Sequence, residues 1–408
     1  MSKTETILLQ LTGRALFGAP TDFDPAGADW TALYQEAAGQ AVPLLIWDIL
    51  TDEERALVPE TTASRWEQDS FHLIMHNERI LYEQEQVIRL LEDAGIPCVI
   101  LKGSSSAACY PRPALRVMGD IDLLTDPGQQ MEAVKLLQAN GYGGVLDETH
   151  HCHMTISKGN VRVEIHKEPN GLFLNENAES VKKIRSFFCD AVERRQFVEG
   201  MPFPSDDQQA VILLLHKLEH FMTSGLGLRQ MCDWAVFADR KLDATDPEGR
   251  ALLQDLIPLL SDFGLLTFAG VMTRACVEYL GLPEEKAPWA MQYEKDTAAK
   301  VIRQILKDGN FGQKTDKYGE RLFTDPHSSN RMTSLVRVLG SACREHWPPC
   351  REHAVLMPVA PFVLLGRYIV QRRRGERHKL DLIRKYRQAG PEQRLYKELK
   401  PFVVEQKR

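Results

Sequence analysis

The feature that most constrains the fold is a short block of strand-like patterns between long stretches with helical periodicity. Within residues 1–95, residues 30–50 and 71–93 place apolar side chains at three- and four-residue spacings, as amphipathic helices do. Gly95 ends this pattern, and beyond about residue 205 the patterns are again almost wholly helical. The sequence therefore predicts an α+β unit flanked by an N-terminal and a C-terminal helical region.

The pattern changes several times within residues 96–168. Residues 119–124 alternate polar and apolar side chains with period two, as a strand does. The other expected elements are a buried strand at 96–103 that enters a turn at Gly103, a helix beginning near Ser104 or Ser105, a helix at 127–140 ended by Asn140-Gly141, and two strands at 153–157 and 160–166 around Lys158-Gly159. The predicted order is strand, helix, strand, helix, hairpin.

The length of 408 residues exceeds what one hydrophobic core usually supports, so we expect roughly two to three domains. We divide the chain into 1–94, an N-terminal helical region; 95–204, the α+β core; 205–366, a helical C-terminal region; and 367–408, a basic helical tail. The composition, 43% hydrophobic and 26% charged, is that of a soluble globular protein and excludes disordered, collagen-like and membrane-spanning classes.

The formal charge of −6 is unevenly distributed. Residues 367–408 carry 14 Lys and Arg against 5 Asp and Glu, a net of +9, so residues 1–366 carry −15. Such a tail can bind an anionic partner, whether phosphate, acidic lipid or nucleic acid, or it can be a solvated basic helix that aids solubility. Both interpretations stay open.

The sequence predicts a cytoplasmic protein with reduced thiols. The first residues contain no long apolar region followed by a small-residue cleavage site. The eight cysteines form no C-x-x-C pair, which argues against a zinc ribbon or a disulfide framework. The apolar run at 354–366 contains Pro358 and Pro361 and is shorter than the roughly 20 residues that cross a bilayer. We expect no transmembrane segment.

The residues that carry chemistry lie close together in sequence. They are Lys102-Gly103-Ser104 at a strand-to-helix turn, Arg116, the pair Asp120 and Asp122, and Glu164 on a later strand. Glycine lets a phosphate approach the backbone closely, and a helix start offers free N–H groups to its oxygens. Aspartates at i and i+2 of a strand point to the same side, as ligands of a divalent cation require. A third carboxylate from a neighbouring strand can complete a second metal position and orient or deprotonate an attacking hydroxyl.

These residues resemble the signature of the nucleotidyltransferase superfamily related to DNA polymerase β. The resemblance is carried by LKGSSSAACYPRPALRVMGDIDLL and the later VEIH. More narrowly, the chain resembles an uncharacterised bacterial nucleotidyltransferase family with an LKG turn, an Arg before D-I-D-L-L and an E-x-H strand in this order. The resemblance implies a small mixed-sheet core, an NTP donor for which we expect ATP, and two Mg2+ ions, with Mn2+ as an alternative.

By position, the resemblance implies that Gly103 and Ser104 bind phosphates, that Asp120 and Asp122 bind metal, and that Glu164 is the third carboxylate. Glu164 is one methylene longer than the Asp often found there, which shifts the reach of its carboxylate and is allowed by the superfamily pattern. From the residues, Arg116 either clamps the triphosphate or pairs with Asp120 or Asp122. Lys102 either binds the nucleotide or pairs with a core carboxylate.

Several histidines offer rival interpretations. His216 and His220 with the Glu between them match H-x-x-E-H, an inverted zinc-peptidase motif, although a packed helix explains the same segment. His150, His151, Cys152 and His153 with His166 suggest a soft metal cluster, but neighbours on a strand point to opposite faces. We expect His166, two residues after Glu164, and His153 to line the site. Arg229 or Asp233 reaches the cleft or forms a helix-surface ion pair.

The sequence thus predicts a metal-dependent nucleotidyltransferase that moves NMP from an NTP to a hydroxyl on a small molecule, peptide or protein and releases pyrophosphate. The alternative is a catalytically inactive nucleotide-binding or interaction protein with the same fold.

Overall fold

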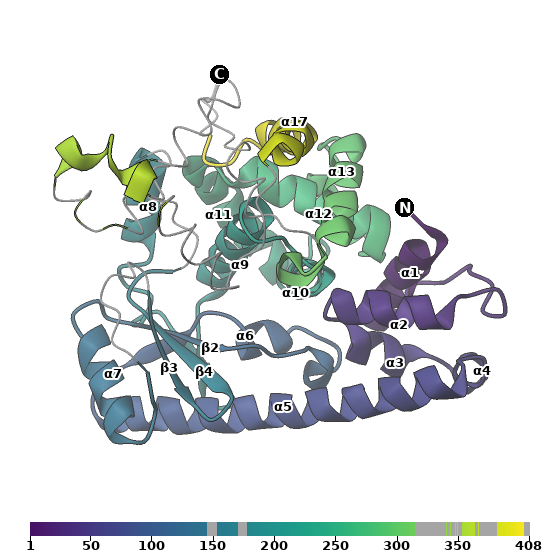
Figure 1. The fold of residues 1–408 in the computed structure, drawn as a ribbon, viewed down its shortest axis with the longest axis horizontal. Helices are drawn as coiled ribbons and strands as arrows, with labels where there is room; N and C mark the ends of the chain where they lie inside the picture. The colour runs from purple at the N-terminus through teal and green to yellow at the C-terminus, as the bar shows by residue number, and fades with distance from the viewer. Residues whose placement is uncertain are drawn as a thin grey trace.

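The structure is a computed structural model, and it describes residues 1–144, 153–169, 178–314, 353–363 and 382–403 together with a few single positions. A small sheet lies against one half of a long helix, and helices occupy the space on either side (Figure 1). The predicted α+β class with N-terminal and C-terminal helical regions is confirmed.

The N-terminal helices pack on the first half of α5. They are α1 (Lys3–Phe17), α2 (Trp30–Gly39), α3 (Pro43–Ile49), α4 (Asp52–Ala56) and α5 (Glu60–Asp93). Trp66 of α5 is fully buried, and its ring lies 5.3 Å from that of Tyr34 and 5.2 Å from that of Trp47. With 34 residues, α5 is about 51 Å long, so it extends from these helices to the far edge of the sheet (Figure 1).

The main sheet has the order β1-β2-β4-β3 and is mixed, because β2 and β4 are parallel and the other pairs are antiparallel. Its strands are β1 (Cys98–Ile100), β2 (Ile121–Thr125), β3 (His153–Lys158) and β4 (Val161–His166). Between them lie α6 (Ser104–Ala107), the 3-10 turn η1 (Pro113–Leu115) and α7 (Gln130–Ala139). The predicted order of strand, helix, strand, helix and hairpin is confirmed.

The helix predicted at 127–140 begins later, at Gln130. The carboxylate of Asp126 accepts a hydrogen bond of 2.7 Å from the backbone N–H of Gly128. A turn therefore precedes the helix, because a short acidic side chain can satisfy the backbone two residues ahead.

One face of the sheet is apolar, and the other carries polar residues. Alternate residues of β2 and β4 form one apolar core with α5 and α7, and they are Ile121, Leu123, Val161, Val163 and Ile165. The opposite face carries Asp122, Glu164 and His166, which are also buried. At the β1 side of this second face, Val99, Leu101 and Leu124 belong to the large core of the helical regions. The polar residues therefore lie where the sheet meets the helical body.

The C-terminal helical body contains α8 (Ala178–Phe187), α9 (Asp206–Met222), α10 (Leu228–Lys241), α11 (Pro247–Phe263), α12 (Leu266–Leu280) and α13 (Lys295–Asp308). Short turns are η2 (Glu284–Lys286), η3 (Pro288–Ala290), η4 (Asn310–Gly312) and η7 (Ala354–Leu356). A hairpin of β5 (Gln196–Val198) and β6 (Met201–Phe203), which the sequence patterns did not predict, precedes α9. Both strands have three residues, too few for a period-two pattern to stand out.

The described part of the basic tail packs on the helical body as α17 (Leu382–Leu399). Leu395, Tyr396, Leu399 and Phe402 are buried, and the hydroxyl of Tyr396 donates a 2.9 Å hydrogen bond to the carbonyl of Phe221. Glu398 pairs with Lys300 at 3.0 Å. Residues 367–381 and 404–408 lie outside the described residues, so the anionic partner of the tail stays a prediction.

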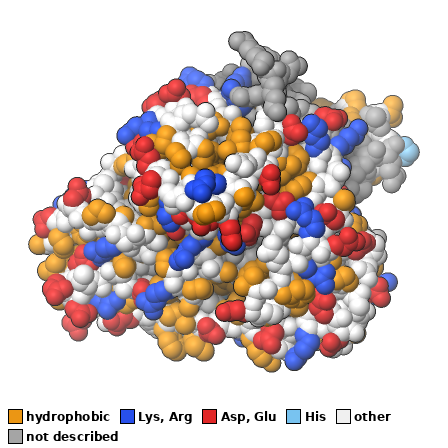
Figure 2. Space-filling model, turned by 180° about the vertical axis from the view of Figure 1, so that it is seen from behind, with side chains coloured by type: hydrophobic (Ala, Val, Ile, Leu, Met, Phe, Trp, Pro, Cys, Tyr) orange, Lys and Arg blue, Asp and Glu red, His pale blue; other side chains and the backbone are white. Residues whose placement is uncertain are grey.

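Figure 2 shows acidic and basic side chains interspersed over one face of the molecule, with hydrophobic side chains between them.

Across the described segments, we find no helix that combines the length and the apolar character needed to span a bilayer.

We predict that Phe402→Ala lowers the free energy of unfolding by about 3–5 kcal/mol, because the ring is 1% exposed and its removal leaves a cavity. Urea denaturation measures the change. The neighbouring Val403→Ala, at a side chain that is 45% exposed, is the control and should change stability by less than about 0.5 kcal/mol. Equal, small effects of both substitutions would contradict the docking of the chain end.

Candidate active site

Three carboxylates meet on the polar face of the sheet. Asp122 of β2 lies directly opposite Glu164 of β4 in the parallel register, and Asp120 precedes Asp122 by two residues. One oxygen from each of the three lies within 4.8 Å of the others. The i, i+2 spacing and the strand register thus place the three predicted acidic residues together, as the sequence analysis expected.

Asp122 is fully buried and has two basic neighbours. Its Oδ1 lies 3.2 Å from Lys102 Nζ and 3.2 Å from His166 Nε2. Burial would raise the pKa of Asp122, but the charge of Lys102 and the hydrogen bond from His166 outweigh burial and lower it. Lys102 therefore pairs with a core carboxylate, one of the two alternatives that the sequence left open.

A second group of possible metal ligands shares Glu164. His153 and His166 are partners across the antiparallel β3–β4 pair, and each Nε2 points toward Glu164 Oε2, at 3.6 and 3.5 Å. Burial would raise the pKa of Glu164, but the hydrogen bond with His166 and the charges of both imidazoles lower it to about 2. Glu164 is therefore an ionised ligand candidate at neutral pH.

The arrangement fits a cation. Oδ2 of Asp122 is buried and has no hydrogen-bond partner among the described residues. Ligand atoms that bind one ion at about 2.1 Å lie about 3.0–3.4 Å apart, close to the separations between Glu164 and the two imidazoles. Oxygen ligands suit Mg2+ or Mn2+, and imidazole suits transition metals. A divalent ion could therefore bind to Asp120, Asp122 and Glu164. His153, Glu164 and His166 form a second group of possible metal ligands.

Asp120 is the most accessible of the three carboxylates, with 22% of its side chain exposed. Its Oδ2 accepts a 3.1 Å hydrogen bond from Arg162 of β4, whose Nε also lies 3.5 Å from Glu164. Arg162 is 59% exposed, so water screens much of its charge. This residue, which the sequence analysis did not single out, is a solvent-facing counterion that a bound metal can replace.

The predicted phosphate turn is present between β1 and α6. Gly103 has φ of 81° and ψ of −105°, a conformation that a side chain would strain. The hydroxyl of Ser104 exchanges hydrogen bonds with the amide of Gln84 at 2.9 and 3.1 Å. The turn therefore has the backbone shape that the sequence predicted, while the Ser104 hydroxyl is held by α5.

Arg116 pairs with Asp233 of α10 instead of with Asp120 or Asp122. Two parallel hydrogen bonds of 2.8 Å join the guanidinium to both carboxylate oxygens, and both side chains are about 95% buried. Tyr110 also donates a 2.8 Å hydrogen bond to Asp233. Burial would raise the pKa of Asp233, but Arg116 holds it below its usual range. The pair joins the segment that leads to Asp120 to the helical body.

Asn77 of α5 fixes the segment that leads to the carboxylates. Its amide nitrogen donates to the carbonyls of Ala114 and Arg116 at 3.0 and 2.9 Å, and its oxygen accepts from the N–H of Met118 at 2.8 Å. From the other side, Arg229 donates to the carbonyl of Val117 at 2.8 Å. The approach to Asp120 is therefore held from two helices.

Sequence reasoning missed Asn77 and Gln84, which lie two turns apart on one face of α5. Buried polar residues on the apolar face of a predicted helix are a usable signal, because such groups need partners. No local sequence pattern indicates that Asp233 pairs with Arg116, because the two residues are 117 positions apart.

His216 and His220 of α9 lie close to the site, with ring centroids 4.3 Å apart. Burial, with the positive charge of Lys102, lowers the pKa of His216 well below its usual value and that of His220 to about 3. Neither imidazole belongs to a possible metal group within the described part of the chain, so the zinc-peptidase interpretation gains no third ligand. The predicted cluster at His150, His151 and Cys152 falls outside the described residues.

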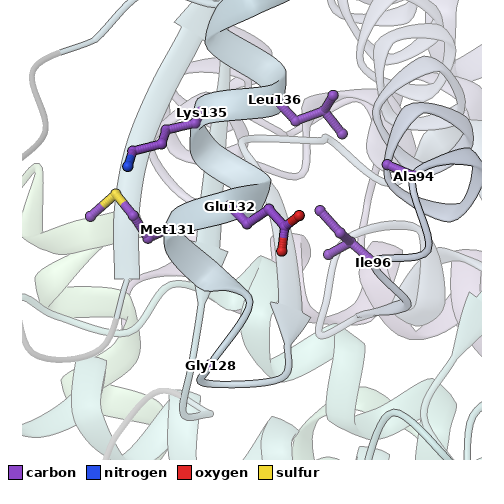
Figure 3. Close-up of a pocket in the computed structure, with 7 residues that line it drawn as sticks. All are labelled: Ala94, Ile96, Gly128, Met131, Glu132, Lys135 and Leu136. Atoms are coloured by element: carbon purple, nitrogen blue, oxygen red, sulfur yellow. The ribbon is translucent and has the colours of Figure 1, made fainter.

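A separate surface depression lies beside α7 and the turn after α5 (Figure 3). Its lining residues are Ala94, Ile96, Gly128, Met131, Glu132, Lys135 and Leu136. Glu132 and Lys135 are its charged side chains. None of the predicted site residues lines it.

A family model described as "Uncharacterised nucleotidyltransferase" matches residues 26–281, more than half of the chain. No curated protein and no solved structure matches the chain. The matched range contains the three carboxylates, the glycine turn, and the Arg116–Asp233 pair. It ends before α13 and η4.

We predict that Asp233→Asn lowers the free energy of unfolding by about 3–5 kcal/mol, because it leaves Arg116 charged and buried without its counterion. Chemical denaturation measures the loss. Asp239→Asn on the same helix breaks the more exposed pair with Lys286 and should cost at most about 1 kcal/mol. A loss for Asp233→Asn no larger than that of the control would show that the buried pair adds nothing to stability.

We predict that stability falls as the pH drops below about 6.5 and that His220 contributes to this fall. The pKa of His220 is about 3 in the folded protein, so between these pH values the unfolded chain binds more protons. His166 opposes the trend, because its pKa is raised by its hydrogen bonds with Asp122 and Glu164 against the effect of burial.

The test is denaturation of His220→Gln between pH 6 and pH 5, where the slope of stability against pH should shrink by up to about 1.4 kcal/mol per pH unit. His72→Gln, at an exposed histidine of α5, controls for removing one imidazole from the unfolded chain. An unchanged slope in His220→Gln would contradict the burial of a neutral His220.

Proposed function

The chain belongs to the uncharacterised nucleotidyltransferase family, and we propose that it transfers NMP from an NTP to a hydroxyl acceptor with release of pyrophosphate. The observation that carries this proposal is the meeting of Asp120, Asp122 and Glu164 within 4.8 Å beside the Gly103 turn. Carboxylates that hold divalent ions suit a metal-dependent phosphoryl transfer, because such ions stabilise charge on both the attacking and the leaving oxygen.

We infer that the core is of the type related to DNA polymerase β. The mixed sheet, the glycine turn after its first strand, the D-x-D pair on the second and the acidic residue on the parallel neighbour support this inference. The family match covers all of these elements.

Asp120 and Asp122 are the proposed ligands of two Mg2+ ions, with Mn2+ as an alternative. When bound, the ions neutralise phosphate charge and acidify the attacking hydroxyl. Asp122 is fixed by Lys102 and His166, so its geometry is set before any ligand arrives. Asp120 is the more exposed side chain and faces the entry from solvent.

Glu164 completes the site. Its pKa of about 2 favours a role as a charged ligand over that of a proton acceptor, because a base of such low pKa removes a proton weakly at neutral pH. His166 and His153 line the site beside it and orient its carboxylate.

Lys102 and the Gly103-Ser104 turn are the proposed contacts for the phosphates. Lys102 pairs with Asp122 and is 14% exposed, so a metal at Asp122 would free its ammonium group to bind a phosphate oxygen. Arg116 is held by Asp233, and direct binding of a phosphate would require exchange of this pair. We therefore propose that the main role of Arg116 is to order the segment that leads to Asp120.

The NTP that we expect is ATP, and the acceptor hydroxyl belongs to a small molecule, a peptide or a protein. The alternative from another class is an inactive protein that binds nucleotide without turnover. Release of pyrophosphate in the presence of an acceptor separates the two, because a binding protein leaves the triphosphate intact.

The test is calorimetric titration of ATP, GTP, CTP and UTP with Mg2+ into the wild-type protein and into Asp122→Asn. We predict that the wild type binds at least one NTP in a metal-dependent manner and that Asp122→Asn weakens this binding by more than about tenfold, because a metal ligand is lost.

Asp126→Asn is the matched control. It lies four residues along the chain, is exposed, and closes a turn with Gly128. It should bind nucleotide as the wild type does. Absence of nucleotide binding by a folded wild type, or equal losses in both variants, would refute the proposed site.

A further inference from the structure

An aromatic ring stands exposed in a strained turn after α13. Phe311 is 44% exposed, whereas Asn310 and Gly312 on either side are buried. Its backbone has φ of 52° and ψ of 34°, the left-handed conformation that bulky residues rarely adopt. The chain thus holds a large apolar ring at the surface where burial would be expected.

The turn is wedged against the connection between α9 and α10. A methyl group at Gly312 would lie 2.0 Å from the carbonyl oxygen of Ser224, and one at Gly227 would lie 2.6 Å from the Cα of Asn310. The N–H of Gly312 donates a 3.1 Å hydrogen bond to the carbonyl of Gly309. Close packing of backbone on backbone therefore fixes where the ring stands.

Two side chains connect this ring to the carboxylates. Arg229 Cζ lies 5.7 Å from the Phe311 ring centroid, and Arg229 also donates to Val117 in the segment that leads to Asp120. The His220 ring meets the Phe311 ring edge-on, with centroids 4.9 Å apart. His220 in turn lies within reach of the charges of Lys102, Asp120 and Glu164. Phe311 therefore lies against two side chains, and one of them, Arg229, holds the segment that leads to Asp120.

We infer that Phe311, with Arg229 and His220 behind it, is the surface on which the nucleobase of the NTP stacks. This inference rests on the proposed function and deepens it, because it states which side of the site holds the base. A planar heteroaromatic ring gains from stacking on an exposed aromatic face, and a guanidinium near the platform strengthens such contacts. Stacking accepts any base, which suits a platform with one aromatic residue.

Chemistry favours the nucleobase of the NTP over the acceptor as the group that stacks on Phe311. Every NTP carries a planar base one sugar away from the phosphates, whereas a hydroxyl acceptor need not carry a ring. The triphosphate is assigned to the Gly103 turn and the carboxylates, so the base must lie to one side of them. The other described exposed phenylalanines are Phe71 on α5, Phe197 on the β5–β6 hairpin and Phe362 after η7, and no contact with the site residues is seen for any of the three.

The test compares two ligands that share phosphates and differ in the base. Mg-ATP and Mg-tripolyphosphate are titrated into the wild type, Phe311→Ala, Phe311→Trp and Phe197→Ala. Phe197 is the matched control, because it is 60% exposed and also has an arginine, Arg195, 5.3 Å from its ring centroid. Thermal unfolding verifies that each variant is folded.

We predict that Phe311→Ala weakens ATP binding by about tenfold and changes tripolyphosphate binding by less than about twofold. Phe311→Trp should keep ATP affinity and show quenching of the new indole fluorescence on ATP binding, relative to the wild type. Phe197→Ala should change neither affinity.

Other results overturn the inference in distinguishable ways. Equal ATP affinity of Phe311→Ala and wild type refutes the base platform while the proposed function stands, and if such a variant raises the KM of an acceptor, Phe311 serves the acceptor instead. Equal losses for ATP and tripolyphosphate show that Phe311 acts on the phosphate site. Absence of binding of any NTP or of tripolyphosphate to the wild type refutes the proposed function and this inference together.

Discussion

Three carboxylates within 4.8 Å of one another, on a largely buried face of a sheet, repel each other strongly, because charges interact more strongly where water is scarce. The neighbouring strands supply what offsets this repulsion. Lys102 follows β1, Arg162 belongs to β4 beside Glu164, and His166 ends the same strand. A divalent ion bound by the three carboxylates would offset the same negative charge that these basic side chains offset.

The sheet can present this charged face because its other face carries the packing. Val163 and Ile165 alternate with Glu164 and His166 along β4. The same strand therefore contributes apolar side chains to the core and polar side chains to the candidate site. The long helix α5 then contributes to both: its apolar side chains cover the core face, while Asn77 and Gln84 hold the loops that carry the polar residues. One helix thus contacts both the Gly103-Ser104 turn and the segment that leads to the carboxylates.

The sequence predicted those parts of the site that follow from local periodicity. Asp120 and Asp122 share a face because strand side chains alternate. Glu164 lies on a strand three elements later that the residue pattern also predicts. The order of elements in 96–168 was predictable for the same reason. The partner of Arg116 was not, because Asp233 lies 117 residues away and a helix pattern does not show which neighbour it meets. The exposed turn of Phe311 has no periodicity at all, and the engagement of Ser104 with Gln84 depends on how α5 packs.

The separation between Arg116 and Asp233 bears on the order in which the protein is built. All strands of the main sheet and the three carboxylates are synthesised before α10, so a nascent chain holds Arg116 without its counterion until the helical body has emerged. Closing such a long loop is slow compared with forming local helices and hairpins, and a charge left unpaired delays burial of the segment around it. The half of the chain that carries the three carboxylates therefore reaches its final shape late, and a fragment cut at the end of the sheet lacks the counterion of its buried Arg116.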